Sequence, residues 1–151
     1  MDKGIYCLVI SHPPCRVRIG AIGEREFSAR FHVYIGSAQG SGGLKRLDRH
    51  FRVATSRNTR PKWHVDYLLT DPRFTLEYAV YAPTAERLEC RLVAALGNHG
   101  TTGFGCSDCT CTSHLLFRNT DPKEEILDAF RHLNLQPAIK TIITPDAKDN
   151  I

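Results

Sequence analysis

Two stretches near the N-terminus decide the fold, Gly4-Ile5-Tyr6-Cys7-Leu8-Val9-Ile10 and Phe31-His32-Val33-Tyr34-Ile35-Gly36. Both are short, apolar and rich in β-forming residues, so each predicts a strand. Between them, Arg16-Val17-Arg18-Ile19 alternates polar and apolar residues, as a half-exposed strand does. Gly20 and Gly23 flank a turn, after which residues 24–29 are expected to return as the hairpin partner. The sequence therefore predicts two strands with an inserted β-hairpin between them.

Further along the chain, glycine and proline clusters separate the remaining elements. Helical spacing of Leu44, Leu47 and Phe51 predicts a helix after Gly43, and alternation predicts a strand over residues 74–81. A helix capped by Thr84 and Gly97, a short helix over 63–69 and a strand over 113–117 are also expected. This order indicates an α+β fold. We expect one domain over residues 1–151, with its core at about 4–117, a C-terminal helix at about 121–133 and a polar tail.

The composition is that of a soluble globular protein, with 42% hydrophobic and 24% charged residues. No apolar run is long enough to span a membrane, and the N-terminus lacks a signal-peptide pattern. A cytoplasmic location without a membrane partner is therefore expected. The six cysteines are better read as reduced thiols or a local metal site than as a disulfide scaffold.

Positive charge is concentrated on the helix expected after Gly43 and on the loop that follows it. Arg46 and His50 are four residues apart and share one face of that helix. Seven positive residues between Lys45 and Lys62 face one negative residue, Asp48. A solvated basic face is the plainer interpretation, but such clustering also suits a phosphate backbone. The expected nucleic-acid contacts are Lys45, Arg49, Arg52, Arg57, Arg60 and Lys62.

Together, Gly4-Ile5-Tyr6, Tyr34-Ile35-Gly36 and Arg46-Leu47-Asp48-Arg49-His50-Phe51 resemble the GIY-YIG nuclease family, over roughly Gly4 to Leu96. A largely uncharacterised archaeal and bacterial branch is similar over more of the chain, at Trp63-His64-Val65-Asp66-Tyr67-Leu68-Leu69, Glu89-Cys90 and Gly103-Phe104-Gly105-Cys106-Ser107-Asp108-Cys109. The resemblance implies a small central antiparallel β-sheet flanked by helices. The gap between the tripeptides is longer than is usual in the family, which fits the inserted hairpin. Fusion of branch members to DNA glycosylases hints at DNA repair.

The resemblance implies a metal-dependent endonuclease that hydrolyses phosphodiester bonds in DNA, with RNA as a further candidate substrate. Tyr6 and Tyr34 would lie side by side, and one of them would activate or position water. Arg46 would neutralise charge on the phosphate, His50 would assist proton transfer, and Glu89 would hold Mg²⁺ or Mn²⁺. The alternative is a catalytically inactive nucleic-acid-binding module of the same fold. A repair protein that supplies targeting is a candidate partner, because the chain has little room for a separate recognition domain.

Several residues keep more than one interpretation. Cys106, Cys109, Cys111 and His114 invite zinc, but their Cys-x-Cys spacing is awkward for one tetrahedral site and favours reduced structural cysteines. A third interpretation places Asp108 and His114 at the rim of the active cleft. The late asparagine of the family has no clear match, and Asn98, Ser107 and Asp108 are its candidates. His64 and Asp66 are either a supporting pair behind the site or a phosphate contact.

Overall fold

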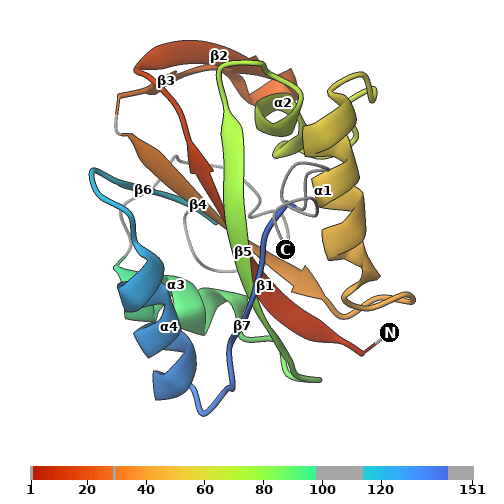
Figure 1. Ribbon diagram of the computed structural model, residues 1–151, viewed down its shortest axis with the longest axis vertical. Coiled ribbons are helices and arrows are strands. Elements are labelled where there is room, and N and C mark those ends of the chain that lie inside the picture. The colour runs from red at the N-terminus through yellow and green to blue at the C-terminus, as the bar shows by residue number, and fades with distance from the viewer. Residues whose placement is uncertain (1, 29, 98–113, 143–151) are drawn as a thin grey trace, which may run out of the picture.

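A five-stranded antiparallel sheet forms the centre of the molecule in the computed structural model, which describes residues 2–28, 30–97 and 114–142 (Figure 1). Its strands follow the order β6-β4-β1-β5-β7, which places the two strands predicted from the tripeptides side by side at the centre. The strands are β1 (Gly4–Ser11), β4 (Phe31–Ala38), β5 (Thr75–Pro83), β6 (Leu115–Arg118) and β7 (Ala138–Lys140). The predicted α+β fold with a central antiparallel sheet is confirmed.

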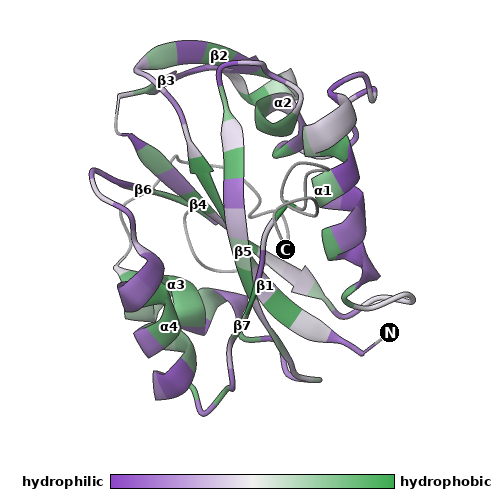
Figure 2. Ribbon diagram, in the orientation of Figure 1, coloured by the Kyte–Doolittle hydropathy of each residue, from purple (hydrophilic) through white to green (hydrophobic). Residues whose placement is uncertain are grey.

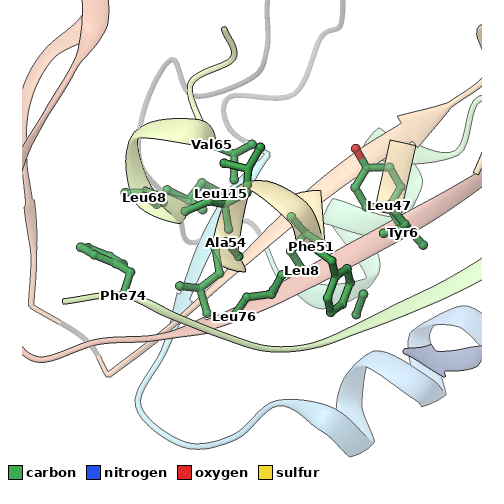
Figure 3. Close-up of a cluster of buried hydrophobic side chains, with 14 of the residues drawn as sticks. Tyr6, Leu8, Leu47, Phe51, Ala54, Val65, Leu68, Phe74, Leu76 and Leu115 are labelled. Atoms are coloured by element: carbon green, nitrogen blue, oxygen red, sulfur yellow. The ribbon is translucent and has the colours of Figure 1, made fainter. Parts of the chain in front are cut away.

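Helices cover both faces of this sheet. One face packs against α1 (Lys45–Ser56) and α2 (Asp66–Leu69), and the other against α3 (Glu89–Leu96) and α4 (Lys123–His132). In β1, Tyr6, Leu8 and Ile10 join the first cluster, and the intervening Ile5, Cys7 and Val9 join the second. Figure 3 shows Tyr6 and Leu8 with Leu47 and Phe51 of α1. Burial of both faces explains why β1 is apolar at successive positions rather than at alternate ones.

The glycines of the two tripeptides are required by close packing. In the β1–β4 register, Tyr6 lies opposite Gly36 and Leu8 lies opposite Tyr34. A Cβ atom at Gly36 would overlap the Tyr6 ring, and one at Gly4 would lie 2.6 Å from the Ala82 carbonyl oxygen. Glycine at position 36 therefore leaves room for the Tyr6 ring, and glycine at position 4 allows close approach to the neighbouring strand β5.

The predicted hairpin is present as a separate two-stranded sheet of β2 (Cys15–Ile19) and β3 (Gly23–Phe27), joined by the short 3-10 helix η1 (Gly20–Ile22). Its apolar side, with Val17, Ile19 and Phe27, is buried in the cluster that contains α2. Its outer side carries Arg16, whose Nε lies 2.6 Å from a carboxylate oxygen of Glu24. The insertion thus extends the core and pairs its own exposed charges.

Two elements differ from the sequence predictions. Thr84 was expected to cap a helix, but α3 begins at Glu89, and the Thr84 hydroxyl instead accepts a hydrogen bond from the Glu86 amide in a turn. The strand β7 was not predicted, because its three residues are too few to show a period; it pairs with Ala79–Tyr81 of β5. Among the helices that the structure describes, none has the length and apolar character that a membrane span requires.

Candidate functional site

A polar pocket of about 260 Å³ lies at the edge of the sheet, next to β4. The strand β6 pairs with β4 over Phe31–Tyr34, and Gly36 and Ser37 line the pocket beyond that pairing. α1 contributes Arg46 from one face of the sheet, and α3 contributes Glu89 from the other. The complete lining is Tyr34, Ile35, Gly36, Ser37, Gln39, Gly40, Arg46, Arg87, Glu89 and His114.

The structure brings the five residues predicted to act together into two adjoining layers. Tyr34, Arg46 and Glu89 line the pocket itself. Tyr6 and His50 lie behind it, where the Tyr6 hydroxyl and His50 Nε2 share a hydrogen bond of 2.7 Å. Arg46 links the layers, because its charge acts on the pKa of the buried Tyr6 hydroxyl while its side chain lines the pocket, and its Nη1 donates to the Ser37 carbonyl at 2.8 Å.

Both residues of the inner layer are neutral. Burial raises the pKa of Tyr6 well above its usual value, and repulsion from Tyr34 adds to this, while Arg46 acts in the opposite direction. Burial lowers the pKa of His50 to about 3; the Asp66 carboxylate acts in the opposite direction, and the charges of Arg49 and Arg46 lower this pKa further. His50 was expected to titrate near neutrality, and this is corrected: the ring is wholly buried and uncharged at neutral pH. Within the described part of the chain, its Nδ1 has no hydrogen-bond partner.

Glu89 is the pocket residue whose chemistry fits a metal ion. It begins α3, and its Oε1 is buried without a hydrogen-bond partner among the described residues. A buried carboxylate oxygen in that state is costly unless something binds it. No group of three or more potential ligands occurs within residues 2–28, 30–97 and 114–142. A single carboxylate suits Mg²⁺, which keeps several waters and takes few protein ligands.

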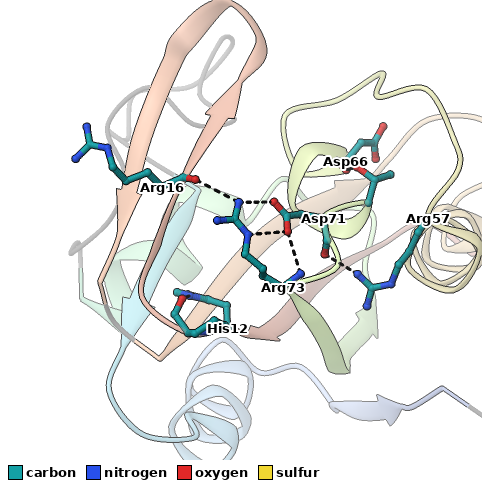
Figure 4. A network of polar contacts seen from close by, with 8 residues as sticks. His12, Arg16, Arg57, Asp66, Asp71 and Arg73 are labelled. Carbon is teal, nitrogen blue, oxygen red and sulfur yellow. Dashed lines mark hydrogen bonds and ion pairs between the residues drawn. The ribbon is translucent and has the colours of Figure 1, made fainter.

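The six residues predicted to contact nucleic acid fall into two groups. Lys45, Arg52, Arg60 and Lys62 are exposed, and Figure 2 shows hydrophilic residues along the outer side of α1. Arg49 and Arg57 are partly buried and already engaged with the protein. Arg49 pairs with Asp66, and Arg57 donates to the carbonyl oxygens of Asp71 and Phe74. Figure 4 shows Asp71 between Arg57 and Arg73.

The remaining sequence candidates have different outcomes. Asp66, suggested as a phosphate contact, is instead a fully buried carboxylate that accepts hydrogen bonds from Arg49. His64 is half-buried just before α2. His114 is buried and lines the pocket, as the third interpretation of the cysteine cluster expected. The other residues of that cluster lie outside the described residues, as do the candidates for the late asparagine: Asn98, Cys106, Ser107, Asp108, Cys109 and Cys111.

Sequence reasoning missed two residues of the pocket. Arg87 lies two residues before Glu89 and adds a second guanidinium to the lining. Gln39 follows β4, and its Nε2 donates to the carbonyl oxygens of Gly4 and Thr84 at 3.2 and 2.9 Å. The sequence feature that could have pointed to Arg87 is its short spacing from the predicted metal ligand Glu89. Gln39 gave none, because its partners lie far away in the sequence.

The family described as Domain of unknown function DUF123 matches the chain over residues 5–135. The matched region contains every residue that lines the pocket. No curated protein and no solved structure matches the chain.

Proposed function

The chain belongs to the family described as Domain of unknown function DUF123, and we propose that it is a metal-dependent endonuclease of the GIY-YIG type. Its substrate would be the phosphodiester backbone of DNA, with RNA as the second candidate. The observation that carries the proposal is the meeting of Tyr34, Arg46 and Glu89 around one pocket, with Tyr6 and His50 directly behind them. These residues come from four separate elements, so their meeting is not a consequence of sequence proximity.

Arg46 is suited to bind the attacked phosphate. Its guanidinium is permanently charged and presents several donors, of which Nη1 is fixed on the Ser37 carbonyl. Fixed donors stabilise charge that develops on a phosphate without needing to reorganise. Arg87 lines the same pocket and would add a second cation for the phosphate oxygens.

Of the two tyrosines, Tyr34 is the one placed to meet substrate. It lines the pocket and is only partly buried, whereas the Tyr6 side chain is 1% exposed. In this proposal the Tyr34 hydroxyl orients the attacking water. Tyr6 remains a neutral phenol beside Arg46 and His50, because its raised pKa keeps the hydroxyl protonated at neutral pH, and a protonated phenol does not act as a general base.

Glu89 would hold the metal ion through its buried Oε1, which has no hydrogen-bond partner among the residues that the structure describes. Bound Mg²⁺ supplies charge stabilisation at the leaving oxygen and the phosphate. Glu89 and Arg46 reach the pocket from helices on opposite faces of the sheet, so different elements supply the group that would bind the metal ion and the group that would bind the phosphate.

Binding to the rest of the substrate would be electrostatic. The exposed Lys45, Arg52, Arg60 and Lys62 continue from α1 into the following loop, and the chain has a formal charge of +4. Such contacts give affinity for any phosphate backbone but carry no sequence information. We therefore propose weak sequence preference and delivery by a repair protein, with the DNA-repair role supported by the family resemblance alone.

Incubation of the purified chain with duplex, flap and damaged DNAs and with RNA, in Mg²⁺ or in EDTA, tests the proposal. We expect strand cleavage in Mg²⁺ that EDTA abolishes. Salt-sensitive binding without cleavage would instead indicate the alternative function, an inactive nucleic-acid-binding module that retains the basic residues of α1. Absence of both binding and cleavage on every substrate would contradict both functions.

A further inference from the structure

The only tryptophan of the chain, Trp63, lies directly behind the pocket. The Cζ atom of Arg46 lies 5.0 Å from the centroid of the indole ring, and that of Arg49 lies 4.2 Å from it. The His50 ring centroid is 5.7 Å away. Trp63 therefore contacts two of the residues assigned to the site, Arg46 and His50, although it does not line the pocket. Lys62 Nζ lies 5.4 Å from the same centroid, so three cations and the His50 ring surround this partly exposed indole.

The position of Trp63 is fixed by Asp66. The Asp66 carboxylate is fully buried and accepts four hydrogen bonds. Arg49 donates from Nη1 and Nη2 at 3.0 and 2.9 Å, in the bidentate geometry that gives a strong, directional pair. The backbone amides of Lys62 and Trp63 donate at 2.8 and 3.0 Å. One carboxylate thus ties the middle of α1 to the backbone that carries the indole.

The Asp66 carboxylate also reduces the net positive charge around the Trp63 ring. Arg46, Arg49 and Lys62 all approach one ring, and like charges so close would repel one another. Asp66 pairs with Arg49 and so removes part of this repulsion. The negative face of the indole attracts a guanidinium. Together with the Ser37 carbonyl, it restricts where the Arg46 guanidinium can lie.

We propose that Trp63, Arg49 and Asp66 form a positioning stack that fixes the Arg46 guanidinium and the His50 ring relative to the pocket. The stack contacts no substrate itself and acts through these two residues. Its effect on cleavage rests on the proposed nuclease function, but its effect on the geometry of Arg46 does not. The two claims can therefore fail separately.

Steady-state cleavage by Trp63→Leu and Asp66→Asn tests the effect on catalysis. We expect kcat to fall by about 10- to 100-fold, the cost of a small misplacement of a catalytic group, with little change in KM. Trp63→Phe keeps an aromatic face and should recover part of the loss. Asp71→Asn is the matched control, because it removes the carboxylate partner of Arg73 away from the pocket and should leave kcat unchanged. If Asp66→Asn does not fold, the two Trp63 variants carry the test.

The fluorescence of Trp63 tests the stack without any cleavage. We expect Asp66→Asn to shift its emission and Asp71→Asn to leave it unchanged. Inorganic phosphate added in EDTA should also change the emission of the wild type, and Arg46→Ala should abolish that response. Cleavage by the wild type together with unchanged kcat in Trp63→Leu and Asp66→Asn would overturn the positioning role while leaving the nuclease function intact. An emission that is identical in the wild type, Asp66→Asn and Arg46→Ala would overturn the stack, whether or not the protein cleaves nucleic acid.

Discussion

The hydrogen bond between Tyr6 and His50 is a polar contact inside an otherwise apolar cluster. The two side chains are 1% and 0% exposed, and the bond between them is 2.7 Å long. His50 Nδ1 already lacks a partner among the described residues. Removal of the Tyr6 hydroxyl would therefore leave both nitrogens of the buried His50 ring without a hydrogen-bond partner among the described residues.

We predict that Tyr6→Phe lowers the free energy of unfolding by about 1–3 kcal/mol, the cost of leaving a buried polar group unsatisfied. Tyr81→Phe removes the same group from the facing position of β5 and is the control, with an expected change within about 0.5 kcal/mol. Urea denaturation of both variants measures the difference. Equal stabilities of the two variants would show that the Tyr6–His50 bond contributes nothing.

At the residue scale, the sequence predicts which residues meet at the pocket better than it predicts their burial, charge and pairing. The spacing of Arg46 and His50 and the family resemblance picked out the residues that meet at the pocket. The same spacing could not show that His50 is buried and neutral, because burial depends on how α1 packs against β1 and β4. Nor could it pair Arg49 with Asp66, which lie 17 residues apart and meet only when α2 folds back onto α1.

At the scale of elements, a pair of histidines joins β1, β4 and the inserted hairpin. His12 follows β1, and its Nε2 lies 2.7 Å from Nδ1 of His32 in β4. Phe27 of the hairpin and Phe74 pack around the His12 ring. Burial lowers the pKa of His12 and lowers that of His32 to about 3, with repulsion from His12 as a second cause.

These shifts predict a loss of stability in acid. The unfolded chain takes up protons on His12, His32 and His50 near their usual pKa of about 6.5, whereas the folded protein resists protonation down to lower pH. Their contribution is therefore complete well above pH 6.5 and falls as the pH is lowered; for His32 and His50 it falls down to about pH 3, by up to about 1.4 kcal/mol per pH unit for each of these two. Urea denaturation between about pH 5.5 and 6.5 measures this slope above most of the range in which carboxylates titrate. We expect a shallower slope in His32→Phe, and an equal slope in the two proteins would contradict the assignment.

The elements themselves were largely predictable because their periodicity is strong. Alternation located β4 and β5, and the apolar run located β1, since each has enough residues to show its pattern. The predicted start of α3 at Thr84 was wrong. Thr84 can cap a helix or a turn equally well, and the local sequence does not distinguish the two. The strand β7 exists because β5 offers an edge for pairing, which is a property of the assembled sheet rather than of residues 138–140.

At the scale of the whole molecule, the pocket depends on the two-sided architecture of the sheet. Arg46 approaches β4 with α1 from one face, and Glu89 approaches with α3 from the other. Arg87 and Gln39 complete the lining from the segments that precede α3 and follow β4. No local sequence pattern predicts that residues from these separate elements line one pocket. The sequence could therefore supply candidate residues through resemblance, but not the pocket or its charge.

The most direct test of the proposed function is the cleavage rate of Glu89→Gln in Mg²⁺. It is measured under single-turnover conditions, with the enzyme in excess over its best DNA substrate. The change keeps the shape of the side chain and removes the charge that would hold the metal ion. Glu125→Gln is the control, because Glu125 lies on α4 and pairs with Arg118 rather than lining the pocket. We predict that Glu89→Gln cleaves at least about 100-fold more slowly than the wild type, while Glu125→Gln cleaves at the wild-type rate. Cleavage by Glu89→Gln at the wild-type rate would contradict the assignment of this pocket as a metal-dependent nuclease site.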